Sequence, residues 1–305
     1  MGLISKKVET RQQFIVPSEL TGGSGNFADT TVNPDQALRL SAVWACVNLL
    51  SNTVSTLPVK AHRPGGAEFS PVLLDAPAAG WTLTDWLEAV MRSLLLRGNA
   101  YGFITARSGP RMSPSQVELV DPDLMSVNVS PEGAVTYRFR GQLADPSDLW
   151  HVRAFRYPGS PLGLSPIQYA AETIGLGLST RRFGQAYFSD GAMPTGVLKV
   201  GQPASDLQID LLREHLKRAT HGRRQPLIVS GDMSWTPLSV SPEQSQFVDS
   251  QRLNVTEIAR VFGVPAAMVD GQSEDSNTYA NLEGRSLHFL QYSLSPWLTR
   301  LENAI

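Results

Sequence analysis

The chain has 305 residues, 42% of them hydrophobic and 18% charged, which excludes disorder throughout and suffices for one large domain or two small ones. The formal net charge is -2, so the chain lacks the excess of lysine and arginine that marks proteins built mainly to grip phosphate. The single cysteine, Cys46, excludes an internal disulfide and a cysteine-based zinc site, and its apolar surroundings predict a buried side chain.

The first 33 residues predict a flexible arm. They are polar and rich in Gly, Ser and Thr, without a sustained helical or strand period. The opening MGLISKKVETRQQ lacks the apolar run that follows the charges of a signal peptide, and no stretch of about 18 uninterrupted apolar residues occurs anywhere. We therefore expect a protein that is neither secreted nor embedded in a membrane, in a reducing environment.

A helix is expected at the start of the folded part. Asn33 and Pro34 can cap and open it, and Leu57 before Pro58 ends it. The apolar residues that follow at mainly helical spacing are Leu38, Val43, Trp44, Val47, Leu50 and Val54. A strand from Val59 to Arg63 is expected next.

A second helix is predicted to begin at Thr82, because Asp85 three residues on completes a capping-box-like pair, and to end at Arg97-Gly98. Its predicted buried side consists of Trp86, Leu87, Val90, Met91, Leu94 and Leu95. From Ala100 to Phe155 short β-rich runs alternate with Pro, Gly and Asp turns. This pattern predicts a small, mostly antiparallel sheet against the two helices, an α+β module.

Two long helices are predicted around a compact insert. The first begins at the cap Ser165 and runs to Asp190-Gly191, about 25 residues or roughly 37 Å. The second opens at Ser241-Pro242 and stops at Gly263. The insert, residues 191–240, shows a strand, a helix from Leu207 to Ala219, and further strands, and is large enough to form a small lobe.

The end of the chain is predicted to be helical. A polar loop, GQSEDSNT, precedes a helical stretch from Tyr279 to Ile305. Pro296 lies inside this stretch, so it is expected to kink or restart the helix.

The order of these segments resembles the portal proteins of tailed bacteriophages of the long-tailed type. The resemblance runs from about Ala37 to the end and is carried by ALRLSAVWACVNLLSNTVSTLPV, LLLRGNAY, GLSPIQYAAETIGLGLSTRRFGQAYFSDGAMPTGVL, SPEQSQFVDSQRLNVTEIARVFGVPAAMV and NTYANLEGRSLHFLQYSLSPWLTRLENAI. None of these segments is a catalytic signature, but their joint order is specific.

The resemblance implies a portal fold in which successive segments of the chain form different parts of the subunit. Residues 34–164 would form an α/β wing, and two stem helices, 165–190 and 241–263, would bracket a clip at 191–240. Residues 264–278 would return to the wing and form the tunnel loop, and 279–305 would be the tunnel helix leading to the crown. Family members usually continue further, so Ile305 is read as a truncation, a disordered tail, or a portal with little crown.

The resemblance also implies partners. Subunits of this family close into a ring, usually of twelve, around a channel for double-stranded DNA at one capsid vertex, so the location would be the virion, and the host cytoplasm during assembly. A closed ring repeats one head-to-tail interface by rotation, which would cover the flanks of long helices. The other implied partners are the large terminase subunit, the major capsid protein and scaffold, and a head-tail adaptor protein, without membrane or cofactor.

Basic residues are concentrated in the predicted clip, where Lys217, Arg218, Arg223 and Arg224 lie close to His221. In an ordinary protein a solvated helix end with cations near its negative dipole is the simpler interpretation. In a ring the patch would be repeated around the axis and could contact DNA or an acidic motor surface, and the sequence does not separate the two. Arg181-Arg182 similarly allow a salt bridge to a neighbouring subunit or a phosphate contact.

The loop before the last helix is the predicted tunnel loop. Its residues are Gln272, Ser273, Glu274, Asp275, Ser276 and Asn277. It carries two acids and no cation, which is the wrong sign for holding phosphate, so in a channel it would favour sliding of DNA over binding. A simple mobile turn is the alternative.

Catalytic and metal-binding signatures are missing, so we predict no enzymatic activity, no cofactor and no metal. Gly175 and Gly177 lack a third glycine and fall inside a helix, and no Gly-Lys-Ser/Thr phosphate loop occurs. Ser230-Gly231 has no preceding glycine at the hydrolase position. The histidines have no metal-ligand spacing, so a structural or surface role is expected. The tryptophans, scattered without basic residues between them, are expected in the core or at subunit interfaces.

Two rival functions stay open at this point. An enzyme fused to a phage structural module would need a nucleophile constellation that the sequence does not contain. A monomeric DNA-binding adaptor would be expected to be basic and compact, whereas this chain is slightly acidic with two long helices. The mass in solution separates the adaptor from a ring.

Overall fold

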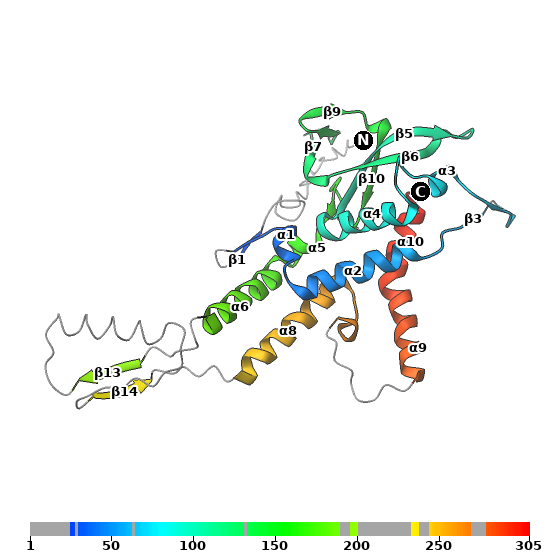
Figure 1. The fold of residues 1–305 in the computed structure, drawn as a ribbon. Helices are drawn as coiled ribbons and strands as arrows, with labels where there is room; N and C mark the ends of the chain where they lie inside the picture. The colour runs from blue at the N-terminus through cyan, green and yellow to red at the C-terminus, as the bar shows by residue number, and fades with distance from the viewer. Residues whose placement is uncertain are drawn as a thin grey trace, which may run out of the picture. The chain divides into compact units, whose positions relative to one another are not determined.

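The computed structural model describes residues 25–27, 30–62, 65–130, 133–189, 196–200, 233–237, 244–269 and 279–305. The chain divides into two units: residues 1–178 with 252–305, and residues 179–251. Figure 1 follows the elements along the chain. Among the described residues, no helix is both long and apolar enough to cross a membrane.

The first expected helix is interrupted. α1 covers Pro34–Ala37 and α2 covers Ser41–Thr56. The cap is confirmed, because the Asn33 side chain accepts a hydrogen bond from the Gln36 amide at 2.8 Å. Leu40, however, has an extended backbone and is 8% exposed. The burial of Leu40 against a later helix overrides the local helical pattern.

Trp44 lies on the exposed side of α2: its side chain is 50% exposed, whereas Val43 and Val47 are buried. Of the two positions predicted for the tryptophans, the core and a subunit interface, the core is excluded for Trp44. The expected strand from Val59 to Arg63 is also shorter: β3 spans only Ala61–His62 and pairs with β4, Glu68–Phe69.

The second helix, α4 (Leu83–Arg97), is confirmed in detail. The Thr82 hydroxyl donates to Asp85 Oδ2 at 2.7 Å and accepts from the Asp85 amide at 3.2 Å, the predicted cap. All six predicted buried side chains are at most 2% exposed. Gly98, with a φ of 73°, ends the helix in the left-handed conformation.

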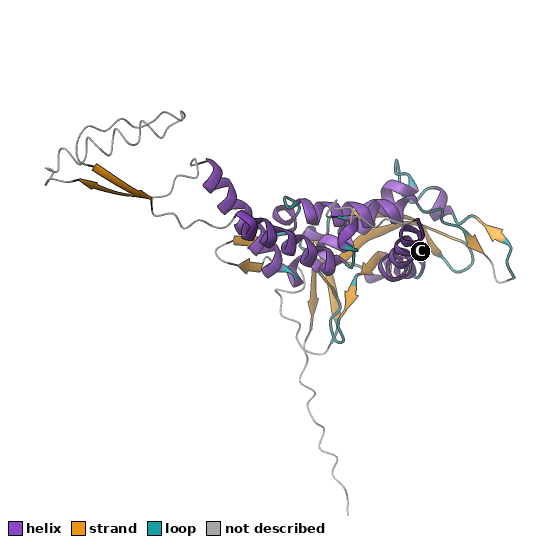
Figure 2. Cartoon of the chain, turned by 90° about the horizontal axis from the view of Figure 1, so that it is seen from below, coloured by secondary structure: helices purple, strands orange, loops and turns teal. Residues whose placement is uncertain are grey.

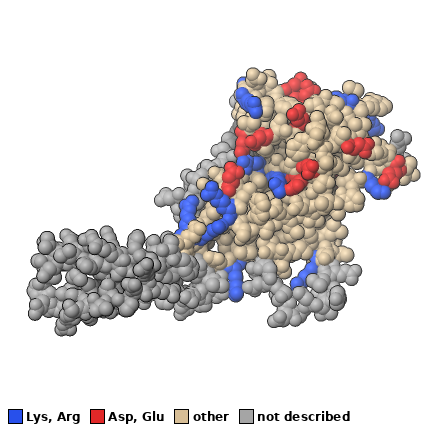
Figure 3. Space-filling view, viewed as in Figure 1, with Lys and Arg blue, Asp and Glu red and all other residues tan. Residues whose placement is uncertain are grey.

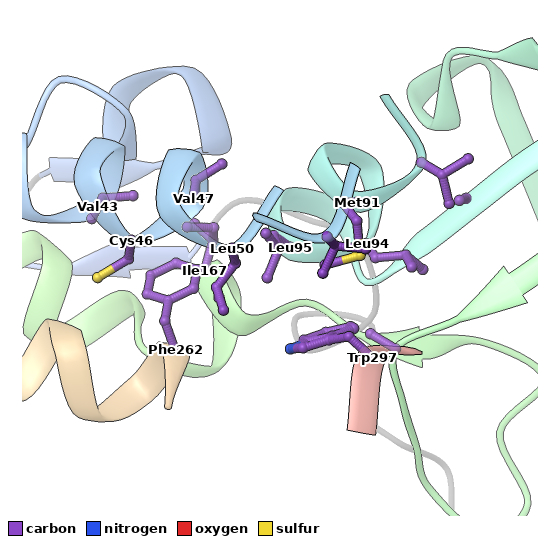
Figure 4. Close-up of a cluster of buried hydrophobic side chains, with 14 of the residues drawn as sticks. Val43, Cys46, Val47, Leu50, Met91, Leu94, Leu95, Ile167, Phe262 and Trp297 are labelled. Atoms are coloured by element: carbon purple, nitrogen blue, oxygen red, sulfur yellow. The ribbon is translucent and has the colours of Figure 1, made fainter. Parts of the chain in front are cut away.

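The hydrophobic core of the first unit is formed by side chains of α2 and α4 together with buried residues of α5, α8 and α10. Figure 4 shows side chains of α2 and α4 converging on residues from three other helices, Ile167, Phe262 and Trp297. Cys46 is buried there as predicted, and burial raises the pKa of its thiol to about 12. The thiol is therefore held as an uncharged, unreactive core group.

The β-rich region forms two three-stranded antiparallel sheets where one small sheet was expected, in the orders β10-β5-β6 and β7-β8-β9. In Figure 2 most strands of this unit lie to one side of its helices, so the predicted α+β class is confirmed. The remaining elements of this region are the following: β1 (Gly25–Phe27), β2 (Thr30–Val32), α3 (Val72–Asp75), β5 (Asn99–Ser108), β6 (Ser113–Val120), η2 (Pro122–Leu124), β7 (Met125–Val129), β8 (Val135–Phe139), β9 (Gln142–Ala144), η3 (Pro146–Asp148), β10 (Leu149–Arg153), β11 (Phe155–Arg156) and β12 (Gly163–Leu164).

The first long helix is not continuous. α5 spans Pro166–Tyr169 and α6 spans Ala171–Ser189, with a break at Ala170. The cap Ser165 is confirmed. Ala170, at the break, departs from helical geometry with φ -98° and ψ 20°, and lies between the hydrogen bond that joins Ser165 to α4 and the one that joins Thr173 to α8. α8 covers Gln244–Phe262 and stops at Gly263, whose φ is 67°, as predicted. The predicted cap at Ser241-Pro242 lies outside the described residues.

The C-terminal stretch consists of three helical pieces after η4 (Ala266–Met268). α9 (Tyr279–His288) leads into a π-helix, η5 (Phe289–Leu294), and then α10 (Ser295–Glu302). Pro296 lies in the first turn of α10, so the predicted restart is confirmed. The Trp150 indole donates to the Ala304 carbonyl at 2.8 Å and fixes α10 to the β10-β5-β6 sheet.

The second unit contains an antiparallel strand pair, β13 (Gly196–Val200) and β14 (Met233–Pro237), with Leu198 opposite Trp235. Both strands were predicted. The predicted helix from Leu207 to Ala219 lies outside the described residues.

Candidate functional site

The start of the first long helix is fixed to the end of α4. The Ser165 hydroxyl donates to the Leu96 carbonyl at 2.9 Å and accepts from the Gln168 amide at 3.4 Å. One side chain thus satisfies a terminal carbonyl of α4 and a free amide of α5, two groups that helix ends leave unpaired. The direction of α5 is therefore set by α4.

Two glycines allow the backbones to meet at this junction. A Cβ on Gly98 would lie 2.4 Å from the carbonyl carbon of Leu164, and one on Gly163 would lie 2.2 Å from the Gly98 carbonyl oxygen. The Gly98 carbonyl also accepts from the Ala154 amide at 2.9 Å. No side chain fits between these segments, so both positions require glycine.

Asn99, directly after the glycine, satisfies the polar groups of the junction. Its Oδ1 accepts from the Gly163 amide at 2.8 Å, and its Nδ2 donates to the carbonyls of Gly163 at 3.0 Å and Arg97 at 3.2 Å. It is 3% exposed. The role of Asn99 was not predicted from the sequence, because Gly163, which supplies two of its partner groups, lies 64 positions away.

His151 extends this polar network into the sheets. Because Asn99 Oδ1 acts as an acceptor, His151 Nε2 donates to it at 3.0 Å and Nδ1 accepts from the Tyr137 hydroxyl at 3.3 Å. That hydroxyl in turn accepts from Arg153 at 3.1 Å, and the imidazole stacks on Tyr101 at 4.3 Å. Burial, together with the positive charges of Arg153 and Arg156, lowers the pKa of His151 to about 3.

The depressed pKa of His151 predicts acid sensitivity. In the unfolded chain the His151 imidazole takes up a proton near pH 6.5, whereas in the folded chain it stays neutral down to about pH 3. The contribution of the neutral imidazole to the free energy of unfolding is therefore complete above pH 6.5 and is lost as the pH falls toward 3. We expect about 2 kcal/mol of the free energy of unfolding to be lost from this site between pH 7.5 and 5.0. Urea denaturation of the dissociated subunit at the two pH values measures it. The loss should disappear in His151→Gln and persist in the matched control His62→Gln, which changes an exposed histidine; an equal loss in all three proteins would contradict the assignment.

α6 and α8 contact each other at Thr173 of α6 and Asn254 of α8. Asn254 Nδ2 donates to the Thr173 carbonyl at 2.9 Å, and a Cβ on Gly177 would lie 2.4 Å from Asn254 Oδ1 and 3.1 Å from Leu40. Gly177 therefore lies where α6 packs closely on the side chains of Asn254 and Leu40. This contact anchors α6 separately from α5.

Large apolar side chains lie exposed beside this contact. Leu176 precedes Gly177 and Leu253 precedes Asn254, so the two leucines flank the same helix-helix contact; they are 50% and 60% exposed. Tyr169, at the end of α5, is 73% exposed.

The charges of the first unit are interspersed. Figure 3 shows acidic and basic side chains mixed over the part that carries the sheets, and a broad area over α2 without charged side chains. α2 contains no charged residue at all. Among the described residues, the charges over the sheets therefore form no single-sign patch of the kind that attracts DNA.

The predicted functional residues are only partly within the described chain. The basic residues Lys217, Arg218, His221, Arg223 and Arg224 and the loop Gln272 to Asn277 lie outside it. Arg181 and Arg182 are exposed on α6. In the part of the chain that is described, no group of three or more His, Cys, Asp or Glu could hold a metal ion.

A pocket of about 310 Å³ lies between the β3-β4 hairpin, α3 and the start of α4. Of its charged residues, Lys60 pairs with Glu68 at 3.0 Å and Asp75 accepts from the Ser70 hydroxyl at 2.7 Å. Its charged groups therefore have partners within the pocket.

Comparison with known proteins decides the family. A family model described as phage portal protein matches residues 41–305. The chain belongs to the phage portal protein family. It is 33% identical to the probable portal protein of Streptomyces phage phiC31, over 94% of this chain and 67% of that protein, and 26% identical to the portal protein of Enterobacteria phage HK97, over 92% and 69%.

Solved structures agree on the portal fold. A crystal structure of an HK97 family phage portal protein from Corynebacterium diphtheriae has a TM-score of 0.66 at 18% identity and covers 90% of each chain. A chain in the neck of a native gene transfer agent particle, computed with C12 symmetry, has a TM-score of 0.62 at 23% identity and covers 88% of this chain and 77% of the other. The predicted resemblance and portal fold are confirmed.

Proposed function

We propose that this chain is a structural subunit that closes with copies of itself into a ring, usually of twelve, around a channel for double-stranded DNA at one vertex of a phage capsid. The observation that carries the proposal is the family match over residues 41–305. The exposed side chains of Tyr169, Leu176 and Leu253 support it, because large apolar groups on the surface of a subunit favour burial against another protein.

The proposal assigns the parts of the chain as follows. Residues 34–164 form the wing, 165–190 and 241–263 the stem helices, 191–240 the clip, 264–278 the wing return and tunnel loop, and 279–305 the tunnel helix. The hydrogen bond from Ser165 to the end of α4 supports the attachment of the first stem helix to the wing, and the hydrogen bond between Asn254 and Thr173 supports the pairing of the two stem helices. The chain acts mechanically, without catalysis or cofactor.

Two further contacts are part of the proposal. The clip residues Lys217, Arg218, Arg223 and Arg224 contact DNA or the large terminase subunit, and the acidic loop from Gln272 to Asn277 lines the channel and lets DNA slide. In the virion the ring takes up the head-tail adaptor, after assembly in the host cytoplasm with the major capsid protein and scaffold.

Co-assembly tests this function. The chain is expressed with the major capsid protein and scaffold of its phage, and the shells are imaged by electron microscopy. One ring at a single vertex of each shell is expected. Shells that form normally without the chain at any vertex would contradict the proposal.

A further inference from the structure

The C-terminal helices carry an apolar pattern that the structure follows only in part. Apolar residues recur three, four, three and four positions apart, which is the spacing of one face of a regular α-helix. They are Leu287, Leu290, Leu294, Trp297 and Leu301. The last three are at most 5% exposed, but Leu290 is 47% and Leu287 is 58% exposed. The buried face that the pattern predicts therefore ends at Leu294.

The π-helix η5 causes this departure. A π turn holds more residues than an α turn, so the helix that precedes it is rotated by about 100°. As a result Phe289, and not its neighbour Leu290, enters the core and is 7% exposed. Leu290 lies four residues before Leu294, so a regular α turn would place it on the same core face. Either of the two neighbouring residues can therefore fill this position.

The two sides of η5 are held unequally. On the C-terminal side, the Ser293 hydroxyl donates to the Gly263 carbonyl at 2.5 Å, and α10 is tied to the β10-β5-β6 sheet. On the N-terminal side, residues 284–288 of α9 are exposed apart from the half-buried Arg285. α9 can therefore rotate about its own axis while α10 stays fixed.

Pro296 weakens the helix near η5. It has no amide hydrogen, so it cannot donate to the Tyr292 carbonyl as the fourth residue along does in a regular α-helix. Its ring also crowds that carbonyl. Neither a π turn nor an α turn over residues 289–294 is therefore fixed by an unbroken series of helical hydrogen bonds.

We infer that residues 279–294 form a two-register element, which exchanges between the π register of this structure and a regular α register rotated by about 100°. In the α register Leu290 replaces Phe289 in the core, and Leu287 turns toward the same face. Because both registers bury a large apolar side chain at this position, their packing is similar, as bistable elements require. The exchange takes place within one subunit and does not require the proposed ring.

An introduced thiol tests the exchange. Phe289→Cys removes most of the side chain that holds the π register and leaves Leu290 intact, so the α register should dominate and turn the thiol outward. In the dissociated subunit this thiol should react with maleimide within about tenfold of the rate of the exposed reference Leu143→Cys. Cys46, which is 0% exposed, should stay unreactive and so report an intact core.

Deletion of Gln291, an exposed residue of η5, gives the matched control. It brings Phe289 to four residues before Leu294, so a regular helix then places position 289 on the core face. With this deletion, the thiol of Phe289→Cys should react at least about tenfold more slowly. Adding Leu290→Ala to Phe289→Cys instead removes the side chain that holds the α register, and should also slow the reaction.

Each outcome decides the inference. A thiol at position 289 that is equally protected with and without Gln291 would show a fixed π-helix and overturn the exchange. Equal reactivity in both would overturn it too, since exposure would then not depend on the register. Labelling of Cys46 in Phe289→Cys would show that Leu290 cannot replace Phe289, with the same consequence.

A solved structure of Phe289→Ala provides an independent test. A regular α-helix over residues 289–294 with Leu290 in the core is expected. A retained π-helix with an empty space at position 289 would contradict the two-register element.

Discussion

Trp86→Ala is expected to destabilise the first unit by about 4 kcal/mol or more. The Trp86 side chain is 0% exposed, its ring lies 5.1 Å from that of Trp150, and its indole donates to the Val117 carbonyl at 2.9 Å. Alanine would leave a large cavity between α4 and the β10-β5-β6 sheet and an unpaired buried carbonyl, which adds about 1–3 kcal/mol. Since domains are stable by only about 5–15 kcal/mol, the subunit should be largely unfolded or insoluble at 37 °C.

Two further variants separate packing from hydrogen bonding at Trp86. Trp86→Phe keeps most of the buried ring but removes the donor, so a loss of about 1–3 kcal/mol is expected. Trp81→Ala changes a side chain that is 44% exposed, and should cost less than about 1 kcal/mol. Urea denaturation followed by circular dichroism measures all three, and equal losses for Trp81→Ala and Trp86→Ala would contradict the proposed core.

Gly98→Ala is expected to destabilise the junction by about 3 kcal/mol or more. The φ of 73° is unfavourable for any residue with a Cβ, which costs about 1–2 kcal/mol. The new Cβ would also lie 2.4 Å from the backbone of Leu164 and 2.7 Å from the Ser165 amide nitrogen. Backbone atoms cannot move aside as a side chain can, so relief requires displacing the start of α5.

Gly80→Ala is the matched control for Gly98→Ala. Gly80 has a nearly equal φ of 76°, but a Cβ there meets nothing within 4 Å. The difference between the two variants in urea denaturation therefore isolates the steric part, expected to be about 2 kcal/mol. The same loss for both would show that α5 does not depend on the close approach at Gly98. Because α5 is the first part of the proposed stem, Gly98→Ala should also impair ring formation more than Gly80→Ala.

Local signals in the sequence predicted the helix caps and the α4 core. Asn33, Thr82 and Ser165 each cap the helix that they were expected to cap, because a cap depends on atoms within three residues. The buried side of α4 followed from apolar spacing alone. The order of several segments predicted the family, although no single segment did.

The breaks in the helices were not predictable, because distant contacts cause them. Leu40 leaves the helical path and packs near Gly177, a residue of a helix much later in the chain. The interruption at Ala170 lies between one anchor on α4 and another on α8. The π-helix Phe289–Leu294 likewise has no local signal in composition or spacing.

The hydrogen-bond network of Asn99 and His151 was not predicted, again because it joins residues that are distant in the sequence. His151 was correctly expected to be structural or on the surface, but its partners Asn99 and Tyr137 come from other strands. The pKa of His151 is lowered because the folded chain buries its imidazole, and no local feature of the sequence indicates this burial. The assignment of wing, stem, clip and tunnel loop stays a prediction from family resemblance.

Native mass spectrometry of the purified chain, with single particles imaged by electron microscopy in parallel, tests whether the chain forms a ring. We expect closed rings of about twelve subunits with a central hole. A stable monomer that forms no rings even beside its capsid protein would rule out the proposed portal function and favour a monomeric DNA-binding adaptor.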